Sequence, residues 1–278
     1  MQETKHTFPI VLTIAGFDGS GGAGIQADIK TISALGAYAT TVLTALPVQN
    51  TMGVQQVHPI PTEIVAAQLE AVLEDISPHA IKIGMLHTEA HIEAICTVLS
   101  SYPEIPVILD PVMVSTSGKR LLDKSAIATM QSLLFPHIAL LTPNMDEAAI
   151  LAGIPVQSVS DMERAGAIIL QHGCPAVLVK GGHMEGEALH AVYSNAKGEQ
   201  QILTQPRVDS NNTHGTGCTL SAAIATFLAR GYTMTKAIEA AQQYVHKAIL
   251  ASKGVHIGKG KGSLNHFFDP QVMHPINR

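Results

Sequence analysis

The chain has 278 residues, of which 46% are hydrophobic and 14% charged, and its formal net charge is −5. This length and composition provide enough apolar material for a sizeable core, in one large α/β domain or two small ones. The acidic balance and the short basic runs argue against a nucleic-acid partner.

Cysteine usage and hydropathy indicate the compartment. The three cysteines, Cys96, Cys174 and Cys218, are odd in number and widely spaced, which suits a reducing compartment better than a disulfide framework. No segment reaches the ~18 consecutive apolar residues of a membrane helix, and the apolar run near the N-terminus fits a buried strand better than a signal peptide. We therefore expect a soluble, cytoplasmic protein without a membrane partner.

Strand-like and helix-like patterns alternate along the chain. Strands are predicted over residues 9–15, 40–48, 54–60, 80–84, 107–110, 138–142 and 176–180, and a hairpin over 190–206. Helices are predicted over residues 25–35, 89–99, 125–134, 146–152, 161–172 and 234–252, and another has Cys218 in its first turn. This alternation predicts a mostly parallel sheet covered by helices on both faces. No linker or repeat divides the chain, so we expect one domain over residues 1–278, with ligands beyond the carboxyl ends of the strands.

Two local patterns give further expectations. Thr62 is predicted to cap a helix whose inner face carries Ile64, Leu69 and Leu73. His87 and His91 have the i, i+4 spacing of metal ligands, but a solvated helix face is the favoured interpretation.

The glycine-rich loop from Gly19 to Gly24 formally matches the G-x-G-x-x-G pattern of dinucleotide-binding proteins. That pattern needs an acidic residue at the end of the second strand, where this chain reads Ala45 to Gln49 without one. A Walker A sequence is also absent, so a dehydrogenase is disfavoured and any phosphate-binding site must use another architecture.

Gly215 and Gly217 stand at the start of a predicted helix, in the sequence Thr-His-Gly-Thr-Gly-Cys. The first amides of a helix lack intrahelical partners and carry its positive dipole end, which favours a bound phosphate. The same field is expected to lower the thiol pKa of Cys218 in the first turn. The alternative is a tight structural loop followed by an inert core cysteine.

Polar residues end three successive predicted strands. Asp110 closes the strand at 107–110, Asn144 and Glu147 follow the strand at 138–142, and Lys180 closes the strand at 176–180. Carboxylates placed in this way suit Mg²⁺, which prefers oxygen ligands and keeps water while it binds phosphates. Taken singly, Asp110 could be a strand-end cap and Glu147 an ordinary first-turn acid.

Several motifs together resemble a known family. The segments GFDGSGGAGIQAD, VQNT, IGML, DPVM, TPNMDEA, VKGGH and NTHGTGCTLSAAIA occur in order, over about residues 10–267. They are similar to those of the hydroxymethylpyrimidine and hydroxymethylpyrimidine phosphate kinases of thiamine biosynthesis, in the ribokinase-like superfamily. The resemblance implies a single α/β domain with a small β flap. It also implies that ATP phosphorylates 4-amino-5-hydroxymethyl-2-methylpyrimidine and then its monophosphate to the diphosphate.

The resemblance also implies roles for individual residues. Cys218 would deprotonate or orient the attacking hydroxyl. The amides of Gly215, Thr216, Gly217 and Cys218 would hold the charge of the transferring phosphoryl group. The implied substrate residues are Gly16, Asp28, Gln49 and Met85; the nucleotide residues are Lys180, His183, His214 and Thr216; the Mg²⁺ residues are Asp110, Asn144 and Glu147.

Two departures from the family pattern are visible. Phe17 stands where relatives often have a small residue. The tail from Gly258 to Ser263 has lysines and a serine where relatives often carry histidines and a proline. Relatives are often dimers, and Val54 and Val57 on the flap would suit a homodimer contact.

Two other functions remain open. A pyridoxal kinase of the cysteine-type branch would share most of these motifs, with Gln49 favouring the pyrimidine substrate. A non-catalytic pyrimidine-binding sensor would be expected to lack Cys218, Glu147 or the glycine pair, all of which are present.

Overall fold

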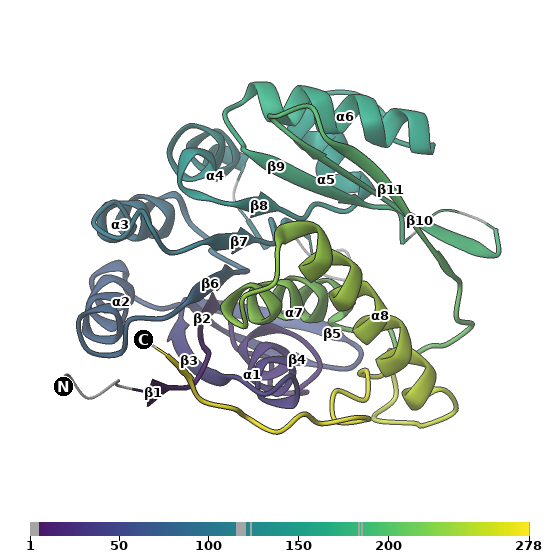
Figure 1. Cartoon of the computed structure of the whole chain (residues 1–278), viewed down its shortest axis with the longest axis horizontal. Coiled ribbons are helices and arrows are strands. Elements are labelled where there is room, and N and C mark those ends of the chain that lie inside the picture. Colours follow the sequence, from purple (N-terminus) through teal and green to yellow (C-terminus); the bar gives the residue numbers. More distant parts are fainter. Residues whose placement is uncertain (1–5, 115–120, 123, 183, 185, 278) are drawn as a thin grey trace.

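The computed structural model describes residues 6–114, 121–122, 124–182, 184 and 186–277. His183, one of the predicted nucleotide residues, lies outside them. The main feature is an eight-stranded sheet in the order β11-β10-β9-β8-β7-β6-β2-β3 (Figure 1). Its strands are β2 (Ile10–Ala15), β3 (Tyr38–Leu43), β6 (Ala80–Ile83), β7 (Val107–Leu109), β8 (Leu140–Leu141), β9 (Ala176–Lys180), β10 (Ala188–Asn195) and β11 (Gln200–Pro206).

Within this sheet, β3, β2, β6, β7, β8 and β9 pair in parallel in that order. The hairpin β10–β11 then pairs with β9 in antiparallel fashion. The helices are α1 (Gly24–Ala34), α2 (Thr62–Ile76), α3 (Glu89–Leu99), α4 (Lys124–Thr129), α5 (Met145–Ala152), α6 (Val159–Gln171), α7 (Thr216–Ala229) and α8 (Met234–Ser252), with a π-helical turn η1 (Met130–Leu134) and a 3₁₀ turn η2 (Phe135–His137). The predicted α/β fold with a mostly parallel sheet is confirmed.

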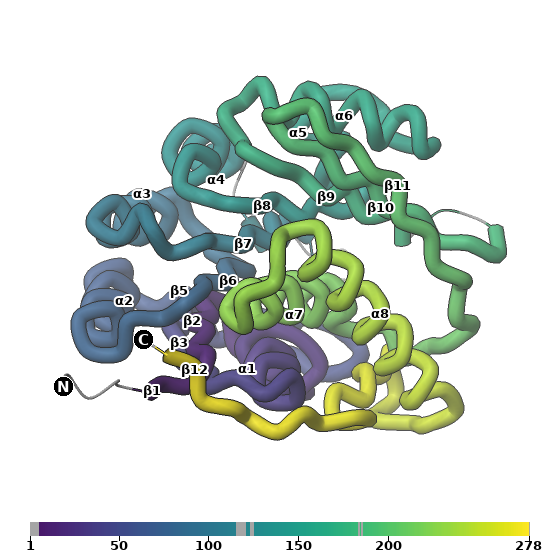
Figure 2. The backbone as a smooth tube through the Cα atoms, in the orientation of Figure 1, coloured from purple at the N-terminus to yellow at the C-terminus, as the bar shows by residue number. Residues whose placement is uncertain are grey.

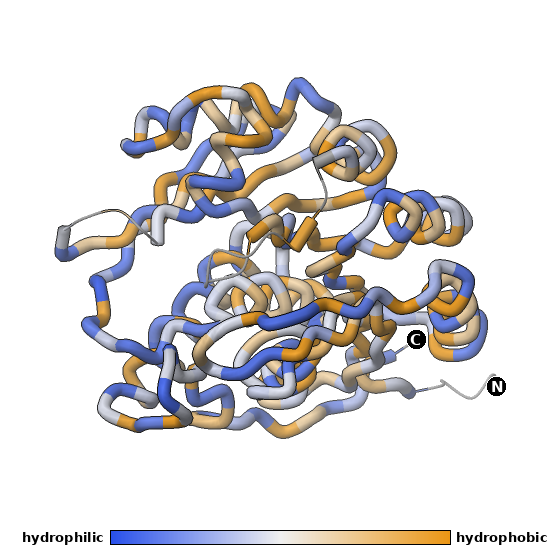
Figure 3. Tube along the Cα trace, turned by 180° about the vertical axis from the view of Figure 1, so that it is seen from behind, coloured by the Kyte–Doolittle hydropathy of each residue, from blue (hydrophilic) through white to orange (hydrophobic). Residues whose placement is uncertain are grey.

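A hydrophobic core lies on each face of this sheet. Helices α2, α3, α5 and α6 cover one core, and α1, α7 and α8 cover the other. Neighbouring residues of a strand alternate between them, as Leu12 and Val11 do in β2. Seen from behind, Figure 3 shows apolar positions gathered on the inner strands, with polar positions along the outer loops.

The strand predicted over residues 40–48 is in fact two strands in two sheets. β3 ends at Leu43 in the central sheet, and β4 (Ala45–Asn50) pairs with β5 (Gly53–Pro59) as a separate two-stranded flap. Thr44 fixes this transition, since its N–H donates to Ala15 and its hydroxyl donates to the Met85 carbonyl. A continuous apolar run does not reveal such a change of sheet, which explains the error.

The start of α2 also differs from the prediction. Pro61 occupies the N-cap and Thr62 is already helical, with no side-chain cap. Val65 rather than Ile64 joins Leu69 and Leu73 in the core, and Ile64 is 50% exposed. The predicted inner face was therefore wrong by one position at its N-terminal end.

His91 is buried rather than solvated, which corrects the second local expectation. Its two ring nitrogens lie 2.6 Å and 2.8 Å from the carbonyl oxygens of Leu86 and Ile60, and His87 Nδ1 lies 2.9 Å from the Leu121 carbonyl. These histidines therefore hold loops together. Among the described residues, no group of three or more His, Cys, Asp or Glu side chains could hold a metal ion.

The two ends of the described chain meet. β1 (His6–Thr7) pairs with β12 (Ile276–Asn277), and the C-terminal segment after α8 runs back along the molecule toward β1 (Figure 2). None of the helices in the described part of the chain is long and apolar enough to cross a membrane.

Candidate active site

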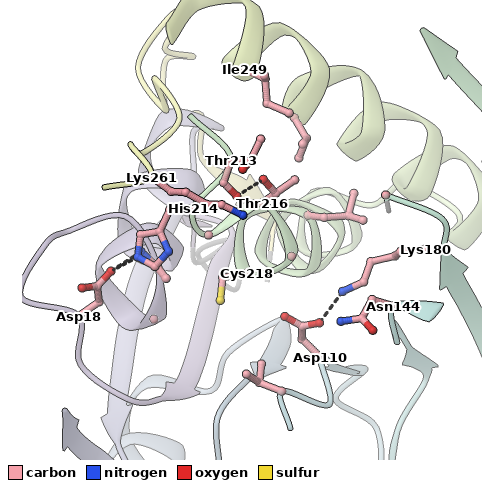
Figure 4. A pocket seen from close by; sticks show the side chains of 18 of the residues that line it. Asp18, Asp110, Asn144, Lys180, Thr213, His214, Thr216, Cys218, Ile249 and Lys261 are labelled. Carbon is pink, nitrogen blue, oxygen red and sulfur yellow. Dashed lines mark hydrogen bonds and ion pairs between the residues drawn. The ribbon is translucent and has the colours of Figure 1, made fainter. Parts of the chain in front are cut away.

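A cavity of about 880 Å³ opens at the carboxyl ends of the parallel strands. Its walls come from the β2–α1 loop, the flap, the ends of β6, β7 and β9, the start of α7 and the loop after α8. Figure 4 shows Cys218 between the His214–Asp18 and Lys180–Asp110 interactions. The predicted location beyond the strand ends therefore agrees with the structure.

Two glycine-rich loops form the floor of this cavity by packing backbone against backbone. Gly215, the N-cap of α7, has φ +81°, and a Cβ there would lie 1.7 Å from the Gly22 carbonyl oxygen. Gly24 has φ +55°, and its Cβ would lie 2.3 Å from the Gly16 carbonyl oxygen. No larger residue fits at Gly215 or Gly24, so these glycines bring the starts of α1 and α7 together.

The first turn of α7 has the requirements of an anion site. The Thr216 N–H bonds to Thr213, whereas the N–H groups of Gly217 and Cys218 have no partner within the helix. Thr216, Gly217 and Cys218 all line the cavity. The predicted grouping of these residues at one helix end is therefore present.

Asp18 connects the two loops, and the sequence analysis did not identify it. Its carboxylate accepts hydrogen bonds from the N–H groups of Ser20, Gly22 and Ala23 and lies 2.9 Å from His214 Nε2. Burial alone would raise the pKa of Asp18, but the hydrogen bonds from His214, Gln49 and Ser20 outweigh it and hold that pKa well below its usual range. The available signal was an aspartate directly before a glycine-rich turn.

His214 therefore has a structural partner. It was predicted to contact the nucleotide, and its ring does line the cavity, but Nε2 is engaged by Asp18. A Cβ on Gly22 would lie 2.5 Å from His214 Cδ2, so the ring also packs closely over the β2–α1 loop.

The expected lowering of the Cys218 pKa is wrong for this structure. Burial raises the pKa of the Cys218 thiol to about 11, while Lys82 lowers it, Asp28 and Asp110 raise it, and a hydrogen bond from the Gly24 N–H lowers it. The helix-end position was correctly predicted, but desolvation of the thiolate outweighs its effect.

Lys180 and Asp110 form an ion pair across the ends of β9 and β7, with 2.7 Å between Nζ and Oδ1. A Cβ on Gly217 would lie 3.2 Å from Lys180 Nζ and 3.3 Å from Asp110 Oδ2. Gly217 thus allows the first turn of α7 to approach this pair. Burial alone would lower the pKa of Lys180, but the nearby carboxylates of Asp110 and Glu147 raise it overall.

Asn144 and Glu147 form a capping box at the start of α5. Asn144 Oδ1 accepts the Glu147 N–H at 2.9 Å, and Glu147 Oε2 accepts the Asn144 N–H at 2.8 Å. Both side chains line the cavity with Asp110. Since capping and ion pairing already use some of their oxygens, this set suits a Mg²⁺ ion held largely by phosphates and water better than full protein coordination.

The predicted substrate residues divide into two groups. Gly16, Gln49 and Met85 line the cavity, and a Cβ on Gly16 would lie only 3.1 Å from Met85 Sδ. Asp28 is fully buried and is not among the lining residues. Its direct contact with a substrate does not fit this placement.

Lys82, bonded to Asp28, reaches the cavity instead. The sequence analysis missed Lys82, although a lysine in the middle of an apolar strand was a usable signal.

The residues that depart from the family pattern also lie at the cavity. Phe17 lines it, as do Lys259 and Lys261 at its rim. The loop that carries the lysines packs on the flap turn, where the Gly260 N–H donates to Thr51 Oγ1 at 3.1 Å.

Comparisons with known proteins agree with this arrangement. A sequence model of the phosphomethylpyrimidine kinase family matches residues 18–265. The hydroxymethylpyrimidine/phosphomethylpyrimidine kinase of Escherichia coli K12 is 45% identical, over 92% of this chain and 96% of its own length.

Two solved structures are also similar. The phosphomethylpyrimidine kinase of Clostridium difficile 630 is 42% identical with a TM-score of 0.76, over 86% of this chain and 99% of that one. A pyridoxal kinase of Staphylococcus aureus, in complex with AMP-PCP and pyridoxal, is 32% identical with a TM-score of 0.86, over 97% of both chains.

Proposed function

Since the chain belongs to the phosphomethylpyrimidine kinase family, it is a kinase, and we propose that its substrates are 4-amino-5-hydroxymethyl-2-methylpyrimidine and then the monophosphate of that compound. ATP is the proposed phosphoryl donor. The observation that carries this proposal is the position of Cys218 at a glycine-flanked helix start, in one cavity with the Lys180–Asp110 pair.

In the proposed first step, the substrate hydroxyl loses its proton to the Cys218 thiolate while its oxygen bonds to the γ-phosphorus. The bond between that phosphorus and the ADP oxygen breaks. The amides of Gly217 and Cys218 and the ammonium group of Lys180 stabilise the charge on the transferring group, which is the main requirement of such a transfer.

Nucleotide and Mg²⁺ binding are assigned to the start of α7 and to the ends of β7 and β9. Lys180 and Thr216 would contact the ATP phosphates, with His183 and His214 as further predicted contacts. Asp110 and Glu147 would hold Mg²⁺ through water, and Asn144 would position Glu147 through the capping box. Mg²⁺, when bound, neutralises phosphate charge.

For the pyrimidine, Gln49 offers both a donor and an acceptor, and Met85 and Gly16 provide an apolar surface. Asp28 would act through Lys82 rather than by direct contact.

Pyridoxal phosphorylation is a second, weaker proposed activity. It is favoured by the similarity to the pyridoxal kinase with bound AMP-PCP and pyridoxal. Both substrates are six-membered nitrogen heterocycles with a hydroxymethyl group.

The test measures ATP-dependent phosphorylation of hydroxymethylpyrimidine, its monophosphate and pyridoxal in parallel. We expect turnover of both pyrimidines by the wild type and a loss of about 10²–10⁴-fold in kcat for Cys218→Ala, the usual contribution of a general base. Cys96→Ala is the matched control, because Cys96 lies on α3 in the core that α2, α3, α5 and α6 cover. Turnover of pyridoxal alone would reject the pyrimidine assignment, and full activity of Cys218→Ala would reject the proposed base.

We also propose a homodimer, through a surface different from the one first expected. Val54 lines the cavity and Val57 packs against Met85 and its neighbours, so both are directed inward. The exposed apolar residues of the flap are Leu46, Val48 and Met52, at 40%, 53% and 68% exposure. Sedimentation of wild type and Val48→Lys tests this proposal. We expect the wild type to sediment as a dimer and Val48→Lys to dissociate, and a monomeric wild type would contradict the proposal.

A further inference from the structure

Lys82 is a charged residue in the middle of β6, and its side chain is 0% exposed. Its neighbours Ile81 and Ile83 point into the core covered by α2 and α3. Alternation along the strand therefore directs Lys82 to the opposite face, where α1 and α7 pack. Burying an ammonium group is costly unless it is paired, so this position calls for a physical explanation.

Asp28 and Thr13 hold Lys82 in place. Lys82 Nζ lies 2.7 Å from Asp28 Oδ2, and the Thr13 hydroxyl donates to the same oxygen at 2.6 Å. A Cβ on Gly84 would lie 2.7 Å from Lys82 Nζ, so the ammonium group packs directly over the backbone at the carboxyl end of β6. Lys82 also lines the cavity, and this places a fixed cation at its wall.

Cys218 lines the same cavity as Lys82. Its helix, α7, packs against β2 and β6, and the Gly24 N–H at the start of α1 donates to its sulfur. The charged groups that act on Cys218 are Lys82 from β6, Asp28 from α1 and Asp110 from the end of β7. The sulfur also acts on Lys180 at the end of β9.

This arrangement addresses a difficulty in the proposed mechanism. Burial raises the pKa of Cys218 to about 11, so most of the thiol is protonated at neutral pH. A base must be deprotonated before it can accept the substrate proton. Lys82 is the charged group with the largest effect in that direction, because it lowers the Cys218 pKa more than any other residue.

We propose that Lys82, fixed by Asp28 and Thr13, is a positioning residue that stabilises negative charge on the Cys218 sulfur. This inference rests on the proposed function, in which the thiol first releases its proton to water. The thiolate then accepts the hydroxyl proton as the new O–P bond forms and the bond to ADP breaks. Lys82 keeps its own proton throughout. Burial acts to lower the pKa of Lys82, but Asp28, Cys218 and Asp110 together raise it overall.

The reaction of Cys218 with iodoacetamide, measured from pH 6 to pH 10 without substrate, tests the inference. We expect Lys82→Met to be alkylated about tenfold more slowly at pH 8, the change that corresponds to one pKa unit. Lys82→Arg, which keeps the charge, should retain most of the rate. Asp28→Asn should react faster than wild type, because Asp28 raises the Cys218 pKa.

The opposite signs separate this role from general structural damage, which would shift Lys82→Met and Asp28→Asn in the same direction. The double variant Lys82→Met/Asp28→Asn leaves no unpaired buried charge and should remain folded. Its rate should lie between those of the two single variants, because the two removed charges act on the thiol in opposite directions. Cys218→Ser measures background alkylation of Cys96 and Cys174, both of which are buried.

The pH dependence of catalysis tests whether the Cys218 thiolate is needed for turnover. The acid limb of kcat/KM for hydroxymethylpyrimidine should move to higher pH in Lys82→Met, in step with the alkylation profile. Equal alkylation of wild type and folded Lys82→Met, or shifts of one sign in both single variants, would overturn the inference. A wild type that shows the alkylation pattern but no pyrimidine turnover would instead reject the proposed function.

Discussion

Two lysine–aspartate pairs of equal length, 2.7 Å, lie near Cys218 but differ in their access to the cavity. Both side chains of the closed pair, Lys82–Asp28, are 0% exposed. In the open pair, Lys180–Asp110, the lysine is 16% exposed and the aspartate 4%. Both members of the open pair line the cavity, whereas only the lysine of the closed pair does.

This difference indicates two uses for one kind of interaction. The open pair adjoins Gly217 and shares its wall with Asn144 and Glu147, so an incoming phosphate or cation can compete for its members. Neither side chain of the closed pair is exposed, so this pair cannot exchange its partners with a ligand. The closed pair therefore contributes a constant electrostatic field. The open pair contributes a surface to which a ligand can bind.

The largest expected contrast is in stability. Lys82→Met leaves a buried carboxyl group without its cation, and we expect a loss of about 3–5 kcal/mol in the free energy of unfolding. Lys180→Met should lose only about 1–2 kcal/mol, because Asp110 borders the cavity. Its kcat should nevertheless fall by about 10²–10³-fold. Urea unfolding and steady-state kinetics of both variants measure this. Equal losses of stability would show that the two pairs are not distinct.

The second contrast is in the pH dependence of stability, and it arises at Glu147 beside the open pair. Burial raises the pKa of Glu147 from 4.5 to about 7, with Lys180 opposing the shift and Asp110 adding to it. Between these values the unfolded carboxyl ionises while the folded one stays protonated. Stability should therefore fall as the pH rises from about 4.5 to about 7, by up to about 3 kcal/mol.

Glu147→Gln should remove this slope, since glutamine can still accept the Asn144 N–H but does not ionise. Urea midpoints at pH 5 and pH 7.5 measure the effect. Glu63→Gln, an exposed first-turn substitution on α2, is the matched control. An unchanged slope in Glu147→Gln would assign the pH dependence to other groups.

The open pair was largely predictable from the sequence, and the closed pair was not. Asp110 and Lys180 end apolar strand-like runs, and the parallel-sheet rule brings such residues to one edge. Asp28 and Lys82 lie 54 positions apart, in a helix and in mid-strand, and no local pattern relates them. Their pairing depends on which strand face α1 covers.

The same distinction explains the error in the Cys218 pKa. Its place in the first turn of α7 is a local property that the glycine spacing revealed. The extent to which the thiol loses water depends on α1 and β6, which pack against α7 but are remote from it in the chain. Desolvation is set by three-dimensional packing, so sequence reasoning found the position of the thiol but gave its pKa shift the wrong sign.

The smallest expected difference between the pairs is the loss of stability when the threonine beside each pair is replaced. Thr13 donates to Asp28 at 2.6 Å, whereas Thr142 Oγ1 lies 3.4 Å from Asp110 and 3.3 Å from the Leu109 carbonyl oxygen. Both threonines are 0% exposed, so Thr→Val changes a hydroxyl for a methyl group in comparable surroundings. We expect Thr13→Val to cost about 1.5–3 kcal/mol, the range for a hydrogen bond to a charged group. Thr142→Val should cost less than about 1 kcal/mol, because its bonds are near the outer limit of useful length. Urea unfolding at pH 7 measures both. A larger loss for Thr142→Val would mean that the open pair, rather than the closed one, depends on its hydroxyl neighbour.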